Sequence, residues 1–548
     1  MLKKNDTINF VDFISHAKFD IPGGIHPRQY KSMSNQRAIT SLAPAKEFFL
    51  AENAKPGNHG KRLVEIGDRV LAGQKIFESF IDQIENNTHS PYDGEVTEIT
   101  HRKLGHASGL SMPGICISRI SQNHTASLPP VKNWQQADPT DLIKRIHEAG
   151  IVGLGGAAFP THVKLNSSEK KIETLIINAM ECEPFITCDD VLIRERASEI
   201  LQGSLITAQI VGASQIMIGI EDNKPEATNA LAEQISKHLQ QTRENNISSP
   251  KIQIIVAETK YPSGGEKQLI QLLTGQQVPQ NKYPAALGIL VQNIATLFAI
   301  YDAVCNGQTL THRLVTLTGN LVEKPGNYWI AFGTPLSHII SKLGIPTNKI
   351  SKIILGGPLM GTAIDKTSKE CFSELNIPTQ KSTNCIIFNS DKSDIMVSSP
   401  NDVHDACIRC GECEVVCPAS LVPQQLYWFA KSEQWEKLEQ NNLRDCIECG
   451  ACSYVCPSQI PLVSYYRFAK SEIKHLKTRK KKSELAKQRF DNRESRLARI
   501  KTEREKKRKK TAEARMLTAA NKNKDPDGKK SAIQAALQRV KDKKEEQS

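Results

Sequence analysis

A cysteine pattern that occurs twice between residues 407 and 457 constrains this chain more than any other feature of its sequence. Each copy has the spacing C-x2-C-x2-C-x3-C-P. Three thiolates on one short loop can bind three corners of a [4Fe–4S] cube, while the fourth cysteine begins the next helix. The eight cysteines are Cys407, Cys410, Cys413 and Cys417 in the first copy and Cys446, Cys449, Cys452 and Cys456 in the second. We therefore predict two [4Fe–4S] clusters in this chain.

The same cysteine run occurs in bacterial ferredoxins, in which the fourth cysteine of each run binds the other cluster. This resemblance implies crossed ligand sets, namely Cys407, Cys410, Cys413 and Cys456 for one cluster and Cys446, Cys449, Cys452 and Cys417 for the second. Zinc suits the pattern less well, because a third closely spaced cysteine is surplus to a tetrahedral ion. Disulfides would require an oxidising compartment, which nothing in the sequence indicates.

The segment between the two copies predicts helices, because its apolar residues Leu426 and Phe429 recur at helical spacing. We therefore expect a mainly helical two-cluster domain. Its aromatic residues Tyr427, Trp428 and Trp435 are expected to pack around the clusters without binding them.

The other six cysteines are scattered, as in a protein from a reducing compartment. They are Cys116, Cys182, Cys188, Cys305, Cys371 and Cys385. The first 20 residues lack the apolar run of a signal peptide. Residues 285–304 are long enough to span a bilayer, but Gln292, Asn293 and Asp302 make them a poor lipid-facing helix. We expect no transmembrane span there, and instead a strand at 288–291 and a helix capped by Asn293.

The basic character of the chain belongs to its last part. The whole sequence has 72 Lys and Arg against 59 Asp and Glu, a net charge of +13. Residues 471–548 hold 27 of the basic and 12 of the acidic residues, a net charge of +15, so the remaining part carries −2. Few apolar residues accompany these charges, which is typical of a solvated helix or a disordered arm. Contact with anionic lipid or a partner protein is the alternative role, and nucleic acid is the least favoured.

The amino-terminal part begins with an extended region around Gly23 and Gly24. Short alternating strands then recur between glycine turns, which predicts a compact β sandwich. This part resembles the lipoyl/biotinyl hammerhead. Carriers of that family are modified on a lysine at a hairpin tip, but no lysine lies between Lys75 and Lys103. We therefore expect a structural or docking role and no attached prosthetic group.

From about residue 141 the pattern changes to alternating helices and strands. A predicted helix leads into the glycine-rich loop from Gly153 to Thr161. Read as G-x-G-x-x-A, the loop resembles a dinucleotide fingerprint, but that motif must follow a strand. The ordinary Rossmann interpretation therefore fails. Clustered glycines still allow backbone amides to approach a phosphate or a flat ring.

Polar residues follow the predicted strands of this α/β domain. The strands are expected at 175–178 and within QIMIGIEDNKPEA, KIQIIVAETKYPSGGEKQLI and LGILVQNIAT. The carboxyl ends of such strands are where α/β sheets bind ligands. The residues at or just after these ends are Asn178, Glu181, Glu183, Tyr261, Gly264, Gly265, Glu266 and Asn293. We therefore expect one ligand crevice along this edge.

Together these features resemble the C subunit of the Rnf (or Rsx) ion-translocating electron-transport complex, which is similar in its centre to the flavin subunit of respiratory complex I. The resemblance runs from Gly23 to about Ala469 and excludes the basic tail. It implies that FMN is lined by Gly153, Gly155, Gly156, Lys164, Asn178, Glu181, Tyr261, Gly264 and Asn293. It also implies that Phe159, Glu183 and Glu266 face NADH.

Three positions depart from the complex I pattern. Ala158 replaces the last glycine of the loop, Met180 replaces an acidic residue before Glu181, and Gly265 replaces an acidic residue after Gly264. Contacts with the flavin phosphate or the nucleotide are expected to differ at these positions. A core α/β domain with a vacant site is the alternative.

The resemblance also implies the order of the domains in a multidomain α/β protein. Residues 309–368, with one helix after Gly333 and a Gly-Gly turn, resemble a soluble-ligand-binding β-grasp domain without catalytic residues. The expected domains are an extended region and hammerhead-like β-sandwich domain at 1–130, a complex-I flavin-subunit-like α/β domain that binds FMN and NADH at 131–308, the β-grasp domain at 309–368, a linker and helical two-cluster ferredoxin-like domain at 369–470, and a basic helical or disordered tail at 471–548.

The function implied is that of a redox subunit of an ion-translocating oxidoreductase. NADH would reduce FMN, the two clusters would carry single electrons onwards, and no general acid–base residue would be needed. The expected location is the cytoplasmic side of the bacterial inner membrane, as a peripheral protein, with membrane subunits of the complex and ferredoxin as partners. The alternatives are a soluble flavin-dependent NADH dehydrogenase subunit and a non-catalytic, cluster-bearing electron carrier or scaffold.

Overall fold

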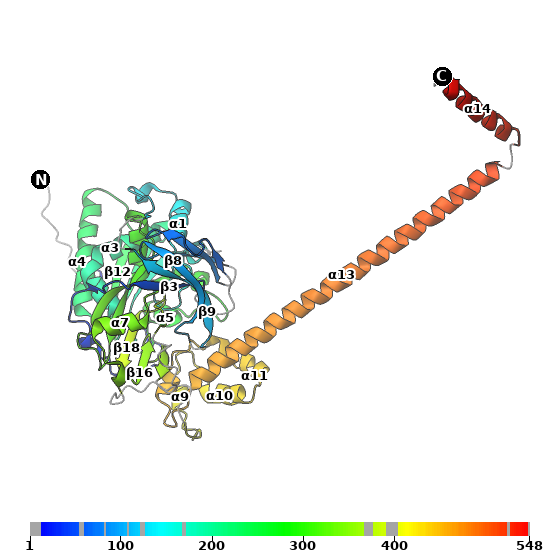
Figure 1. Cartoon of the computed structure of the whole chain (residues 1–548). Coiled ribbons are helices and arrows are strands. Elements are labelled where there is room, and N and C mark those ends of the chain that lie inside the picture. The colour runs from blue at the N-terminus through cyan, green and yellow to red at the C-terminus, as the bar shows by residue number, and fades with distance from the viewer. Residues whose placement is uncertain are drawn as a thin grey trace. The chain divides into compact units, whose positions relative to one another are not determined.

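The computed structural model describes residues 13–53, 60–81, 84–106, 109–120, 126–166, 171–365, 376–390, 404–522 and 526–545 (Figure 1). The chain divides into two compact units, Met1–Ala469 and Lys470–Ser548. The four sheets formed by the described residues and both cysteine runs belong to the first unit. Short 3-10 helices lie at Lys31–Met33, Trp134–Gln136, Pro284–Leu287, Thr347–Lys349 and Leu443–Asp445.

A five-stranded parallel sheet organises the first unit. Its strands, in spatial order, are β1 (Ile14–His16), β12 (Lys251–Ala257), β11 (Gln215–Glu221), β10 (Thr174–Ala179) and β13 (Ile289–Asn293). The four strands predicted for the α/β domain are confirmed, and β1 is an addition from the amino-terminal region. Parallel strands are buried on both faces, which explains their nearly continuous apolar sequences.

Helices flank this sheet. They are α1 (Pro139–Glu148), α2 (Thr161–Asn166), α3 (Cys188–Val211), α4 (Pro225–Glu244), α5 (Glu266–Thr274) and α6 (Ile294–Cys305). Alternate residues of β10 point to opposite faces, so Leu175 and Ile177 join the core with α3, α4 and α6, whereas Ile176 joins the core with α5. Asn293 ends β13 and caps α6 by accepting a hydrogen bond from Ala295 N, as predicted.

Two antiparallel sheets of short strands form the β-rich part that the sequence predicts. One has the order β3 (Glu47–Ala51), β9 (Ser111–Arg119), β8 (Gly94–Lys103), β5 (Arg69–Val70), and the other β4 (Gly60–Arg62), β6 (Lys75–Ile81), β7 (Ile84–His89). Burial alternates at the start of β8, where Val96 is buried between exposed neighbours. Val96, Ile115 and Ile117 share one apolar core with the α/β domain, so the two parts pack together.

A six-stranded mixed sheet follows the α/β domain in sequence. Its order is β17 (Thr362–Asp365), β16 (Lys352–Leu355), β18 (Cys385–Asn389), β14 (His312–Thr318), β15 (Gly326–Ala331), β2 (Thr40–Ser41). Helix α7 (Leu336–Leu343) packs on it and begins after Gly333, as predicted. Strands β2 and β18 lie outside the range 309–368 predicted for this domain. The apolar strand β18 is buried because it lies between β16 and β14.

The cysteine runs lie in a helical segment, as predicted. Its helices are α9 (Glu412–Val415), α10 (Pro423–Lys431), α11 (Trp435–Gln440) and α12 (Ala451–Tyr454). The sequence repeat is also a repeat of backbone geometry, because Gly411 and Gly450 precede α9 and α12 with φ angles of 84° and 79°. Tyr427 is buried, whereas Trp428 is 42% exposed and lies against Tyr427, so the expectation that Trp428 is a core residue is wrong.

Two helices form the basic tail, α13 (Leu462–Lys522), which begins within the first unit, and α14 (Pro526–Glu545). Nearly all described side chains after residue 474 are exposed, as expected of a solvated helix. Among the described residues, no helix combines the length and the apolar character needed to cross a bilayer. Cys371 and most of the predicted linker (366–375 and 391–403) lie outside the described residues.

Candidate functional site

Two cavities in the helical segment each bring together four cysteines. One is lined by Cys407, Cys410, Cys413 and Cys456, and the other by Cys417, Cys446, Cys449 and Cys452. Each cavity therefore takes its fourth cysteine from the other copy of the repeat. These are the same sets that crossed ligation predicts. The remaining lining is mostly apolar and includes Tyr427 and Ile460 in the first cavity and Leu421 and Tyr466 in the second.

The chemistry of both cavities suits a [4Fe–4S] cube, which requires four thiolates and an otherwise apolar shell. Backbone amides donate to two of the sulfur atoms, from Leu421 N to Cys417 Sγ (3.4 Å) and from Glu448 N to Cys446 Sγ (3.4 Å). Hydrogen bonds of this kind stabilise the thiolate form. The two sites differ in exposure, because Cys410 is exposed whereas Cys449 and Cys452 are buried.

The glycine-rich loop lies between α1 and α2, so it follows a helix, as the sequence indicates. It is closed by hydrogen bonds from Gly153 N to Phe159 O (2.8 Å) and from Ala158 N to Gly153 O (3.1 Å). A Cβ on Gly156 would have no heavy atom within 4 Å, and one on Gly155 would lie 3.4 Å from Asn293 Cβ. The loop therefore presents bare backbone next to the end of β13. Ala158 has a φ of 51°, a left-handed conformation that glycine adopts more readily.

The strand ends bring several predicted residues to the same edge. Asn178 and Asn293 are neighbours in the register of β10 and β13. Asn178 Nδ2 donates to Gly264 O (2.8 Å), and Asn293 Nδ2 donates to Asp189 Oδ2 (2.6 Å). The edge and the glycine loop together have the backbone exposure and amide side chains that suit FMN.

Lys164 and Glu266 form an ion pair with 2.5 Å between Nζ and Oε1. Both side chains are partly exposed, at 32% and 40%. Because α2 carries Lys164 and α5 begins with Glu266, this pair links the glycine loop to the strand-end segment that contains Gly264. Phe159, predicted to face the nucleotide, is 41% exposed.

Tyr261 is buried and Glu181 and Glu183 are half-buried, and all three already have partners within the chain. The carboxylate of Glu181 accepts from Asp189 N (2.6 Å) at the start of α3, and burial raises its pKa to about 8. The carboxylate of Glu183 accepts from Leu359 N (3.2 Å) and Met360 N (2.8 Å), and burial raises its pKa to about 7. Both carboxylates thus accept hydrogen bonds that fix the edge.

Tyr261 connects this edge to the second cysteine cavity. Its hydroxyl donates to Cys449 O, and its side chain is 1% exposed. Tyr261, Cys182, Val416 and Cys449 belong to one apolar cluster. The carboxyl-terminal edge of the sheet and the Cys446–Cys452 loop are therefore in direct contact.

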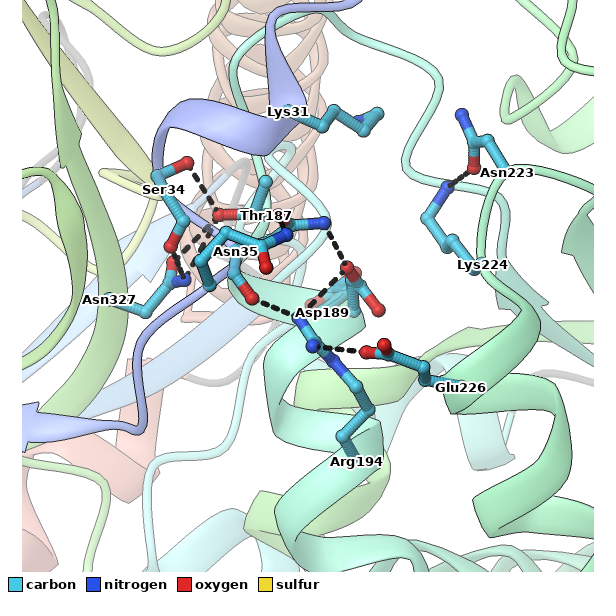
Figure 2. Close-up of polar contacts among 12 residues, drawn as sticks. Lys31, Ser34, Asn35, Thr187, Asp189, Arg194, Asn223, Lys224, Glu226 and Asn327 are labelled. Atoms are coloured by element: carbon cyan, nitrogen blue, oxygen red, sulfur yellow. Dashed lines mark hydrogen bonds and ion pairs between the residues drawn. The ribbon is translucent and has the colours of Figure 1, made fainter.

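A network of buried polar groups around the turn between β10 and α3 was not predicted from the sequence. Figure 2 shows part of it, including Lys31 and Lys224. Lys31 Nζ donates to Glu181 O, Glu183 O and Ile186 O, and Lys224 Nζ donates to Met180 O and Glu221 Oε2. Lys224 comes shortly after strand β11, which the sequence predicts, so its position at a strand end could have marked it as a site residue. Lys31 lies in a segment without periodicity, so no local pattern marks it.

Three protein-family models match the chain. Residues 19–122 match the "RnfC Barrel sandwich hybrid domain", residues 146–302 match the "Nuo51 FMN-binding domain", and residues 406–460 match the "4Fe-4S dicluster domain". The chain is thus a multidomain α/β protein with FMN and [4Fe–4S] clusters as its cofactors. The matched ranges contain the β-rich part, the glycine loop with the strand-end edge, and all eight cysteines of the two runs.

Curated relatives are named as the C subunit of the ion-translocating oxidoreductase complex. One from Edwardsiella ictaluri is 42% identical over 95% of this chain and 61% of its own length, and one from Vibrio cholerae is 42% identical over 98% and 66%. The chain thus spans about two thirds or less of these two relatives. One from Haemophilus influenzae is 40% identical over 89% of this chain and 71% of its own length.

Among solved structures, an NAD+-reducing [NiFe]-hydrogenase in the H2-reduced state is 20% identical, with a TM-score of 0.44 over 59% of this chain and 61% of that one. The similarity to the curated relatives is much stronger and covers more of this chain. It agrees with the three domain matches and with the order of the parts along the chain. The chain belongs to the family formed by the C subunits of ion-translocating oxidoreductase complexes.

Proposed function

We propose that this chain is the peripheral redox subunit of a membrane-bound complex that couples electron transfer to ion translocation. The proposal depends mainly on one observation, the direct contact of the Cys446–Cys452 loop with the strand-end edge through Tyr261 and Cys449. A flavin bound at this edge would lie beside a cluster without intervening solvent. FMN, when bound, takes up two electrons as a hydride and gives them up singly.

The residues of this chain would hold and orient the cofactors. The glycines of the loop allow close approach of backbone amides, and Asn178 and Asn293 fix the facing strand ends. The residues proposed to line FMN are Gly153, Gly155, Gly156, Lys164, Asn178, Glu181, Tyr261, Gly264 and Asn293. Phe159, Glu183 and Glu266 are proposed to face NADH. For Glu183 this would require release of the Leu359 and Met360 amides, whose hydrogen bonds its carboxylate now accepts.

The two cysteine cavities would hold the clusters in series. The Cys407 set has the exposed Cys410 and an exposed neighbour, Ile408, whereas the Cys446 set contains the buried Cys449 and Cys452. We include in this proposal that the β-rich part is a hammerhead-like domain and that the mixed sheet is a β-grasp domain. The boundaries expected for the five domains belong to it as well. So do the membrane subunits and ferredoxin as partners, and the cytoplasmic face of the inner membrane as the location.

The experiment is cofactor analysis of protein purified without oxygen. We expect flavin to be released on denaturation and NADH to bleach the flavin absorbance of the native protein. A Gly155→Val variant places methyl groups against Asn293 and should lower NADH-dependent dye reduction at least about 10-fold while iron content is kept. Native protein that contains clusters but neither binds flavin nor reacts with NADH would leave the electron carrier or scaffold as the function.

A further inference from the structure

The amino-terminal segment Gln29–Asn35 lies across the turn that joins β10 to α3. Phe185 N donates to Gln29 O (2.8 Å), and the rings of Tyr30 and Phe185 stack with 4.5 Å between centroids and 9° between planes. The hydroxyls of Ser34 and Thr187 are 2.8 Å apart. A segment more than 140 residues away in sequence thus forms one wall of the turn that carries Glu181 and Glu183.

Further contacts fix the end of this segment to α3. Asn35 Nδ2 donates to Asp190 Oδ2 (3.2 Å), and Arg194 Nη2 donates to Asn35 O (2.6 Å) (Figure 2). Asn327 of β15 donates to Ser34 O (3.1 Å), so the mixed sheet supports the segment as well. The segment is therefore held on both sides of Lys31.

The ammonium group of Lys31 is the centre of this arrangement. It donates to three carbonyl oxygens of the turn, those of Glu181 (2.6 Å), Ile186 (2.8 Å) and Glu183 (3.1 Å). An ammonium group has three N–H donors, so each has a carbonyl partner. Lys31 is only 7% exposed, and main-chain carbonyls take the place of its hydration shell.

The backbone of this turn needs such support. Glu181 and Phe185 have φ angles of 49° and 68°, which side-chain-bearing residues adopt at a cost. The carbonyl oxygens of Glu181, Glu183 and Ile186 converge on the Lys31 ammonium group. Without the ammonium group, three carbonyl dipoles would converge in a buried space. Lys224 Nζ donates to the carbonyl oxygen that precedes the turn, Met180 O (2.7 Å).

We propose that Lys31 is a positioning residue of the flavin and nucleotide edge, supplied by the amino-terminal segment in place of a bound cation. It acts through the turn, because the turn fixes where Glu181 meets the start of α3 and where Glu183 meets Leu359 and Met360. Arginine is a poor substitute, because its planar fork cannot direct three donors to converging carbonyls. This role rests on the proposed function of the edge.

The test is the Lys31→Met variant of the full chain, purified without oxygen together with Lys31→Arg. Lys237→Met is the matched control, because Lys237 is an exposed lysine of α4 that pairs with Glu233 one helical turn away. We expect kcat/KM for NADH-dependent dye reduction to fall at least about 10-fold in both Lys31 variants, with a shifted flavin reduction potential. The cluster spectra and iron content should match those of the wild type, and the control should match it in every respect.

Folded Lys31→Met protein with wild-type kcat/KM and flavin potential would overturn the proposal. If Lys31→Met does not fold, the Lys31→Arg variant carries the test, because it keeps the positive charge but cannot direct three donors to the converging carbonyls. A loss of at least about 10-fold in kcat/KM is then expected of Lys31→Arg, and wild-type kinetics in this folded variant would overturn the proposal equally. Wild-type protein that holds no flavin and does not oxidise NADH would instead show that the proposed function itself fails.

Discussion

At the scale of single residues, the fourth cysteine of each run is the most informative position. Cys417 lines the cavity of the second run, and Cys456 lines the cavity of the first. A local motif can bind only three corners of a cube, so crossed ligation by these two residues would join the two clusters into one folding unit. Loss of one such thiol should therefore disturb the cluster at the other cysteine run.

The first prediction uses this exchange. In Cys417→Ala, the cluster bound by Cys446, Cys449 and Cys452 should lose its fourth ligand, while in Cys456→Ala the Cys407 cluster should be affected. Wild-type protein should contain about eight irons per chain. Iron analysis and electron paramagnetic resonance of both variants test this. Damage by Cys417→Ala confined to the Cys407 cluster would contradict the crossed sets.

Glu183 gives a pH-dependent prediction. Burial raises its folded pKa from 4.5 to about 7, so the folded chain binds the proton more tightly than the unfolded chain. The associated stability is fully present below pH 4.5 and is lost as pH rises through 7, by up to about 3 kcal/mol. Thermal unfolding between pH 5 and 8 should show a smaller pH dependence in Glu183→Gln than in the wild type. Parallel pH profiles would show that Glu183 does not titrate in this range.

At the scale of elements, the amino-terminal segment precedes the β-rich part and also contacts three parts of the proposed site. Gly24 N donates to Val416 O (2.9 Å), and Ile25 pairs with Tyr261 through two backbone hydrogen bonds (2.8 and 2.9 Å). A few residues later Lys31 holds the turn after β10. One short segment thus contacts the Cys417 end of the first run, Tyr261 and the strand-end turn.

Gly23 provides the prediction at this scale. A Cβ there would lie 2.6 Å from Val416 C and O, and its φ is 59°. Gly23→Ala should lower the free energy of unfolding by about 1 to 3 kcal/mol and disturb the cluster that includes Cys417. Gly67→Ala is a matched control, because Gly67 also has a positive φ, 91°, but has nothing within 4 Å of its Cβ position. Equal effects of the two substitutions on stability and on the cluster spectrum would mean that the contact with Val416 is unimportant.

At the scale of the whole molecule, charge and redox chemistry belong to different units. The first unit, Met1–Ala469, contains both cysteine cavities and the strand-end edge proposed to bind flavin, and the sequence up to residue 470 is close to neutral. The second unit carries the excess of basic residues on exposed helices. Its apolar residues Leu485, Phe490 and Leu497 are exposed and too widely spaced for an inserted amphipathic face.

Truncation after Ala469 tests this separation. The shortened chain should keep both clusters and NADH oxidation, because no described part of either site lies in the second unit. Retention on membranes that contain the partner subunits should fall only partly, since spaced acidic residues and salt weaken the attraction of the tail to anionic lipid. Sedimentation with such membranes at physiological salt measures this. Complete release of the shortened chain would identify the tail as the anchor.

Local sequence was enough to predict several elements of this protein. The cysteine spacing, the apolar strands of the parallel sheet, the Asn293 cap and the solvated tail all depend on neighbours within a few residues, so their patterns can be read directly. The clustering of the glycine loop and strand ends at one edge also follows, because parallel strands place their carboxyl ends together.

Only the tertiary structure decided which distant groups complete the site. β1, β2 and Lys31 come from a region that reads as extended, since strand pairing and burial of a lone lysine depend on partners more than 140 residues away. The same holds for Glu183, whose carboxylate accepts from the Leu359 and Met360 amides of the connection between β16 and β17. Such contacts depend on how the sheets pack against one another. Packing of this kind produces no periodic pattern of residues within a single segment, so it cannot be predicted from local sequence.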